Sequence, residues 1–231
     1  MRTAIMVTMS TSIRGRPRGA LRRRRQRPYH HGDLRRALVE AALELVRAKG
    51  PEGFALREAA RRVGVSQTAP YRHFRTREAL LAAVAEEGFR ALQRRLEEVG
   101  AAAGPDPLPR LRALGEASFE FYVADAARFR VMFGPVSALK DRYPALARAW
   151  ARVNALLLEA LVACQRAGEI RDGDPMEIGL TTAAVVHGLA ALAVDGQLGD
   201  AAADPRAALE IYRRARTVLF GGLRPTRREP E

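Results

Sequence analysis

Apolar residues recur every three or four positions along almost the whole chain, which is the period of an amphipathic α-helix. No segment shows the two-residue alternation of a half-buried strand, and no internal repeat or glycine-rich phosphate loop is present. Glycine and proline interrupt the pattern, and two of the interruptions, 100–109 and 134–144, are predicted to be loops. The sequence therefore predicts an all-α fold, with helices over residues 33–49, 56–63, 67–73, 76–99, 111–122, 129–133, 146–167, 175–196 and 205–221.

The segment 56–74, LREAARRVGVSQTAPYRHF, predicts two short helices at a large angle. Gly64 supplies the positive φ that ends the first helix, and Ser66 is a suitable N-cap for the second, from Gln67 to His73. Two helices joined by a tight turn form a helix-turn-helix, in which the second helix enters the DNA major groove. Its outward groups suit bases and phosphates: Gln67, Thr68, Tyr71, Arg72 and His73. A solvated helical hairpin fits the same periodicity.

Charge favours the DNA-binding interpretation. The chain carries a net charge of +13, and residues 1–75 hold 18 basic and 5 acidic residues, which already gives +13. Residues 76–231 carry 21 of each and are neutral. An arginine-rich surface without a partner would spread this excess along the chain, whereas a nucleic-acid partner explains its position around the helix-turn-helix.

The same patterns predict the domain organisation. Residues 1–28, with a dense group of arginines and no acid, are expected to be a disordered basic arm that adds salt-sensitive affinity for DNA. A translation start at Met6 or Met9 is an equally good interpretation of this region. Residues 29–75 are then the DNA-binding domain, 76–222 a connecting helix with an effector-binding and dimerisation domain, and 223–231 a tail.

Other functional classes find little support. The four histidines (30, 31, 73 and 187) and the single Cys164 form no catalytic or metal-ligand spacing, so we expect no enzyme, no metal site and no cofactor. No stretch approaches the roughly 18 unbroken apolar residues of a membrane span, and residues 1–9 are too short and polar for a secretory signal. We therefore expect a cytoplasmic protein that does not interact with membranes.

Residues 56–84, LREAARRVGVSQTAPYRHFRTREALLAAV, resemble the helix-turn-helix and connecting helix of the tetracycline-repressor (TetR) family of bacterial regulators. Residues 29–46 and 127–135 resemble one subgroup, whose Trp-His-Gly signature corresponds here to Val186-His187-Gly188. The resemblance implies a ligand-released repressor that binds a palindromic operator in double-stranded DNA as a homodimer, paired through its last two helices. It also implies DNA contacts for Gln67, Thr68, Tyr71 and His73, and phosphate contacts for Arg57 and Arg77. Ser66 is included among the predicted DNA-binding residues.

Three residues depart from this pattern or strain it. Ala55 stands where the family commonly has a Ser or Thr that caps a helix, a loss of about 1 kcal/mol. Val186 replaces the signature tryptophan, so no ligand role of that indole carries over. Pro70 removes one backbone donor within the predicted recognition helix.

The effector is a small molecule of unknown chemistry, and its site is expected among the aromatic residues of 108–190. Aromatic residues at helical spacing also fill an ordinary core, so the two interpretations compete at each position. The predicted ligand-binding residues are Phe121, Tyr122, Phe129, Phe133, Trp150, Asn154 and His187. The alternative function is a non-specific architectural DNA binder without a ligand response, although the neutral, aromatic-rich body argues against it.

Overall fold

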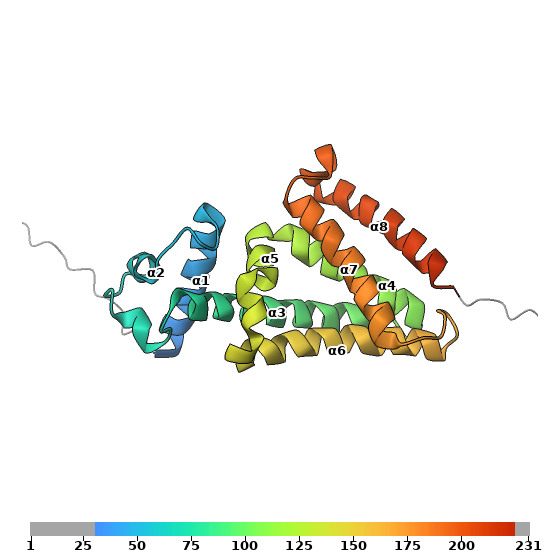
Figure 1. The fold of residues 1–231 in the computed structure, drawn as a ribbon, viewed down its shortest axis with the longest axis horizontal. Coiled ribbons are helices and arrows are strands. Elements are labelled where there is room, and N and C mark those ends of the chain that lie inside the picture. Colours follow the sequence, from blue (N-terminus) through green and yellow to red (C-terminus); the bar gives the residue numbers. More distant parts are fainter. Residues whose placement is uncertain (1–30, 225–231) are drawn as a thin grey trace, which may run out of the picture.

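The computed structural model describes residues 31–224, which form helices and contain no strand. The basic arm predicted for residues 1–28 and most of the predicted tail lie outside the described residues. The chain has a small head and a larger helical body, joined by one long helix (Figure 1). The elements are α1 (His31–Lys49), α2 (Leu56–Val63), η1 (Ala69–Arg72, a 3₁₀ turn), α3 (Arg77–Ala102), α4 (Pro107–Ala124), α5 (Ala126–Phe133), η2 (Pro135–Arg142), α6 (Pro144–Arg166), α7 (Pro175–Val194), η3 (Gly199–Ala202) and α8 (Pro205–Gly222).

The head packs α1 against α2 and the first turns of α3. Leu38 and Ala42 of α1 and Ala59 of α2 are fully buried, and Phe54 and Phe74 close the core at either end of the helix-turn-helix. The alanines allow the helix backbones to approach closely at their crossing. These small residues are therefore part of the core of the head.

Helix α3 belongs to both parts of the molecule. Its 26 residues span about 39 Å at 1.5 Å per residue. It contacts α1 in the head and α4, α5 and α6 in the body, and Figure 1 shows it running from the head alongside α6. The Thr76 side chain caps it by accepting the Ala79 N–H at 3.1 Å, as the sequence predicts. Any rotation of α3 in the body is therefore transmitted to the head.

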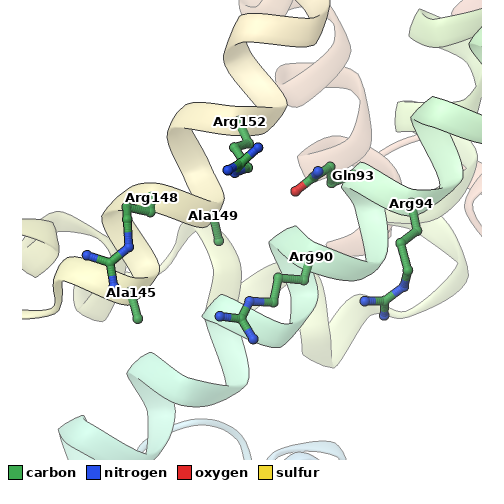
Figure 2. Close-up of a pocket in the computed structure, with 7 residues that line it drawn as sticks. All are labelled: Arg90, Gln93, Arg94, Ala145, Arg148, Ala149 and Arg152. Carbon is green, nitrogen blue, oxygen red and sulfur yellow. The ribbon is translucent and has the colours of Figure 1, made fainter.

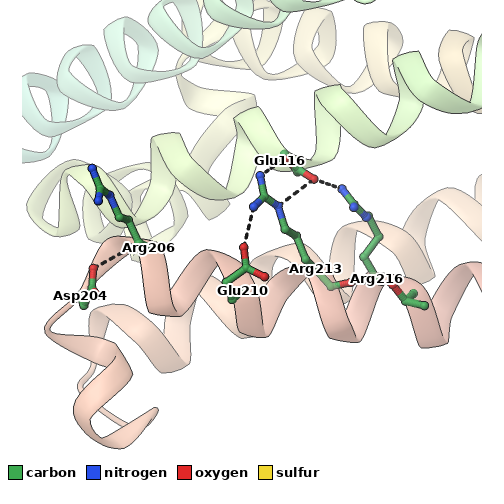
Figure 3. Close-up of polar contacts among 7 residues, drawn as sticks. Glu116, Asp204, Arg206, Glu210, Arg213 and Arg216 are labelled. Atoms are coloured by element: carbon green, nitrogen blue, oxygen red, sulfur yellow. Dashed lines mark hydrogen bonds and ion pairs between the residues drawn. The ribbon is translucent and has the colours of Figure 1, made fainter.

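The outermost helix, α8, is attached to α4 by one aromatic stack and one ionic group. The Tyr212 ring stacks on fully buried Phe119 at 4.8 Å between centroids. Beside it, Arg213 and Arg216 both donate to the Glu116 carboxylate (Figure 3). Burial alone would raise the pKa of Glu116, but these hydrogen bonds outweigh it and lower the pKa.

Four body helices begin with proline in their first turn, where the missing N–H has no intrahelical partner: Pro107, Pro144, Pro175 and Pro205. In α7 and α8 the preceding aspartate also caps the helix, because Asp174 accepts the Met176 N–H and Asp204 accepts the Arg206 N–H. These starts are set by local sequence.

Two predicted loops are wrong in extent. Within 100–109, α3 continues to Ala102 and only residues 103–106 separate it from α4. Gly100 is buried inside α3, where a Cβ would meet Leu114 of α4 at an ordinary van der Waals distance of 3.5 Å, so this glycine neither ends the helix nor is required by the packing. Within 134–144, residues 135–142 form the 3₁₀ segment η2. Composition predicted both segments as loops because it does not distinguish a glycine inside a helix, or a proline that begins one, from a turn.

Helix α7 has a largely exposed apolar surface. It is long and apolar enough to cross a membrane by composition, with a mean hydropathy of 1.6 over a window of which 22 % is buried. Leu180 is 71 % exposed and Met176 63 %, and Val218 of α8 is 78 % exposed. Exposed apolar surface of this kind marks a contact with a partner. It lies on α7 and α8, the two helices through which the family resemblance implies dimerisation.

The missing cap at Ala55 gives a direct test of local stability. Ala55 is the N-cap of α2 and makes no side-chain cap hydrogen bond, although its N–H donates to the Glu58 carboxylate at 3.1 Å. We expect Ala55→Thr to complete the reciprocal pair and raise the free energy of unfolding by about 1 kcal/mol in urea titrations. Ala55→Val has the same shape without the hydroxyl, and an equal gain from it would contradict this explanation.

Candidate DNA-binding and effector sites

The helix-turn-helix turn has the predicted geometry. Gly64 adopts φ 78°, and its N–H donates to the Arg61 carbonyl at 3.1 Å. The Val65 N–H returns to the Ala60 carbonyl at 3.0 Å, which completes the C-terminal cap of α2. A side chain at position 64 would be strained in this left-handed conformation.

The recognition segment differs from the prediction. A helix from Gln67 to His73 with Ser66 as its N-cap is wrong, because the structure has the short 3₁₀ turn η1 preceded by Thr68. Pro70 has no N–H to give to the ladder and its ring is buried in the head, so the backbone tightens around it. The Ser66 hydroxyl lies 3.2 Å from that of Thr68 instead of capping the backbone.

Most of the predicted DNA-binding residues are exposed. Those that are exposed are Arg57, Ser66, Gln67, Thr68, Tyr71 and Arg72. His73 is half-buried, and its Nε2 is buried without a hydrogen-bond partner among residues 31–224, so a DNA contact through this atom requires the ring to turn. The Arg77 guanidinium donates to the Glu52 carbonyl at 2.7 Å, which holds the loop before α2 against the start of α3.

The structure adds Arg75, which the sequence analysis did not single out. Arg57, Arg72 and Arg75 are exposed and have no ion-pair partner in the described part of the chain, whereas Arg61 and Arg62 pair with Glu58 and Glu44. Unpaired guanidinium groups around a recognition segment are available for phosphates. The position of Arg75 between η1 and α3 was the only sequence signal for this role.

Four of the seven predicted ligand-binding residues form one cluster. Tyr122 of α4, Phe129 and Phe133 of α5 and His187 of α7 are in mutual ring contact. The Phe133 ring lies 5.1 Å from that of Tyr122 and 4.6 Å from that of His187. Burial raises the pKa of Tyr122 well above its usual range, so its hydroxyl stays protonated. We call these four residues the aromatic cluster.

The other three predicted residues lie at its edge or elsewhere. Phe121 points partly outward, with the Arg128 guanidinium 5.9 Å from its ring centre. Trp150 and Asn154 are exposed on α6, where the Asn154 amide donates to the Trp150 carbonyl and Lys140 lies 4.5 Å from the indole centre. The prediction that these two share a site with His187 is not supported, because helical period does not say which neighbour a face meets.

His187 predicts a pH dependence of stability. Burial lowers the pKa of His187 below 6.5. At pH values between this lowered pKa and 6.5, the unfolded chain therefore binds more protons than the folded protein does. Stability is therefore full above pH 6.5 and falls as the pH is lowered through this window. We expect the urea midpoint of the protein to drop more between pH 7.5 and 5.5 than that of His187→Phe, and equal drops would contradict the assignment.

The described surface also has two clefts, and none of the predicted ligand-binding residues lines either of them. One cleft lies between the end of α1 and the junction of α4 and α5, where Arg47 of the head donates to Asp125 of the body at 2.6 Å. Burial alone would raise the pKa of Asp125, but the hydrogen bonds from Arg47 and from the Arg128 N–H lower it. This ion pair is a direct contact between head and body.

A compact helix-turn-helix head with unpaired arginines, carried by one long helix on an all-helical body, defines a DNA-binding regulator with a separate sensing and assembly domain. Comparison with known proteins supports this class. Residues 38–84 match the model of bacterial regulatory proteins of the tetR family, and residues 111–215 match the tetracyclin repressor-like C-terminal domain. The chain belongs to the tetracycline-repressor family of transcriptional regulators, whose members are not enzymes.

Individual relatives agree with this placement. The tetracycline repressor protein class C of Escherichia coli is 48 % identical over 52 residues, 22 % of this chain and 24 % of that protein, so the match spans about a quarter of the curated relative. A solved protein of unknown function from Rhodococcus sp. RHA1 is 33 % identical, with a TM-score of 0.72 over 86 % of this chain and 99 % of that one. The fatty acid degradation regulator FadR from Bacillus halodurans is 16 % identical, with a TM-score of 0.68 over 85 % of this chain and 99 % of that one. This similarity shows that the two proteins share a fold.

Proposed function

We propose that this protein is a homodimeric repressor that leaves a palindromic operator when a small molecule occupies the aromatic cluster. The contact between Phe89 and Phe133 carries the proposal. Phe89 is buried on α3, and its ring meets Phe133 of the cluster edge-on at 5.6 Å between centroids. A ligand that displaces Phe133 therefore acts directly on the helix that holds the head.

The two DNA-binding heads of a dimer must reach half-sites separated by about 34–36 Å or a multiple of it. A rotation of α3 changes this separation, because α3 carries the head and, within residues 31–224, the contact of α1 with α5 is the main additional link between head and body. To convert operator from nearly all bound to nearly all free, the effector must prefer the non-binding conformation by about 5.5 kcal/mol. An aromatic cluster suits an apolar ligand with few polar groups, of which His187 and Tyr122 would be the partners.

In this proposal the residues that contact DNA are Arg57, Ser66, Gln67, Thr68, Tyr71, Arg72, His73 and Arg77, with Arg75 added from the structure. The functional division is a head of residues 29–75 and a body of residues 76–222, and the protein acts in the cytoplasm. The match of its body to the family's C-terminal domain favours a ligand-responsive regulator over a non-specific DNA binder.

The first experiment compares duplex DNA from upstream of the protein's own gene with a scrambled duplex at two salt concentrations. We expect a preference of about a thousandfold that survives the higher salt, as in operator recognition. A library of apolar small molecules is then screened for release of this DNA. Tyr71→Phe should weaken binding to the operator, and Phe133→Ala should change the release by an effector while leaving DNA affinity intact.

Equal binding to both duplexes that disappears in high salt would contradict operator recognition at this DNA. Repeating the assay with a genomic fragment library distinguishes a distant operator from purely electrostatic binding. An effector that releases DNA equally well from Phe133→Ala would place the ligand outside the aromatic cluster.

A further inference from the structure

The second cleft lies between α3 and α6, outside the aromatic cluster, and is lined mainly by cationic groups (Figure 2). It encloses about 390 Å³, within the range of roughly 300–1,000 Å³ typical of small-molecule sites. The small side chains of Ala145 and Ala149 on α6 leave this volume open. The remaining lining residues are Arg90, Gln93 and Arg94 from α3 and Arg148 and Arg152 from α6.

The positive charge on the α6 side of this cleft is uncompensated. Arg148 and Arg152 are one helical turn apart and exposed, and neither has an ion-pair or hydrogen-bond partner among residues 31–224. Like charges at this spacing repel each other and destabilise a helix by a few tenths of a kcal/mol. An anion between them would remove this repulsion.

On the α3 side each arginine of the cleft is paired with a carboxylate, so the uncompensated charge of the cleft lies on α6. Arg90 pairs with Glu86 at 2.7 Å and Arg94 with Glu87 at 3.2 Å, while the Gln93 amide donates to Glu97. Arginine pairs on facing helices, each separated by about 6 Å along its helix, match a ligand with more than one anionic group. Guanidinium groups bind phosphate oxygens with two parallel hydrogen bonds, which favours phosphate.

We propose that this cleft binds a small molecule bearing two or more phosphate groups. The site is independent of the aromatic cluster and does not rest on the proposed effector response. Its ligand has Arg148 and Arg152 as primary partners and Arg90 across the cleft. Arg94 and Gln93 extend the site along α3.

Occupancy of this cleft acts on the head through one carboxylate. Glu86 is 8 % exposed and is shared between Arg90 at 2.7 Å and Arg35 of α1 at 3.5 Å. A phosphate that takes the Arg90 guanidinium leaves Glu86 to Arg35 alone and so strengthens the link between α1 and α3. The site therefore lies where a ligand can bias the position of the DNA-binding head.

The test uses the full chain and inorganic diphosphate as the probe, without divalent cations and at constant ionic strength. We expect saturable binding by calorimetry and a rise in melting temperature that follows the same binding curve. Arg148→Gln/Arg152→Gln should weaken diphosphate binding at least tenfold, and Arg148→Lys/Arg152→Lys should give an intermediate loss because it keeps charge without the paired donors. Sulfate, with one anionic group, should bind at least tenfold more weakly than diphosphate.

The matched control is Arg166→Gln/Arg171→Gln, which removes the same charge from exposed positions at the far end of α6 and just beyond it. This control should bind diphosphate as the unmodified protein does. The proposal is overturned if diphosphate does not saturate, or if both double variants lose binding equally. It is also overturned if Arg148→Gln/Arg152→Gln binds diphosphate normally but loses affinity for duplex DNA, which would assign the cleft to the DNA backbone.

Discussion

Replacing Met176 and Leu180 with arginine is expected to make the protein monomeric and to lower its affinity for a two-half-site operator by about 10² to 10⁴. The two side chains lie one turn apart on α7 and are largely exposed. In a symmetric dimer each side chain meets its partner's surface, so four added charges would be buried without counter-ions. Sedimentation and DNA-binding titrations measure the two effects.

The control adds the same charge at the same spacing on another exposed helix face. Ala151→Arg/Ala155→Arg places two arginines on α6 and should leave both assembly and operator affinity unchanged. A Met176→Arg/Leu180→Arg protein that stays dimeric would show that another surface forms the interface. A monomer with full operator affinity would instead show that DNA recognition does not need two joined heads.

The second large effect is expected from Phe119→Ala, which should lower the free energy of unfolding by about 3–5 kcal/mol. Phe119 is fully buried and forms the only aromatic stack between α4 and α8 in the described structure. Its removal leaves a cavity under Tyr212 and weakens the attachment of an assembly helix. We therefore also expect the dimer to dissociate at a higher protein concentration than the unmodified dimer does. Urea unfolding measures the stability and sedimentation measures the dissociation.

Phe121→Ala is the matched control, because it removes the same atoms from the opposite side of the same helix. Phe121 is only half-buried, so its loss should cost clearly less than that of Phe119. Equal losses from the two variants would show that α8 does not depend on this stack.

The sequence alone predicted the structural features that depend on residues close together in the chain. The helix-turn-helix followed from apolar spacing and from Gly64, and the starts of α7 and α8 from Pro175 and Pro205. The recognition segment was mispredicted because the backbone effect of Pro70 depends on the ring being buried in the head. Local pattern alone does not report that burial.

The sites were less predictable because they depend on contacts between distant segments. Trp150 has the spacing of a core residue, yet it is exposed on α6, with Lys140 of η2 against its ring. The cleft between α3 and α6 is lined by residues that are more than fifty positions apart in the chain. Neither segment of the sequence alone therefore indicates it. The contact of His187 with Phe129 and Phe133 was anticipated from a short motif and a nearby aromatic pattern, and its ligand-binding role stays a prediction.

The proline starts of the body helices limit how this molecule can change shape. A helix that begins at Pro107, Pro144, Pro175 or Pro205 cannot grow backwards by another turn, because proline disfavours helical conformation in the residue before it. The N-terminal ends of these four helices are therefore fixed. This favours movements of the body in which intact helices tilt and slide about their short connections, the shear type of domain movement.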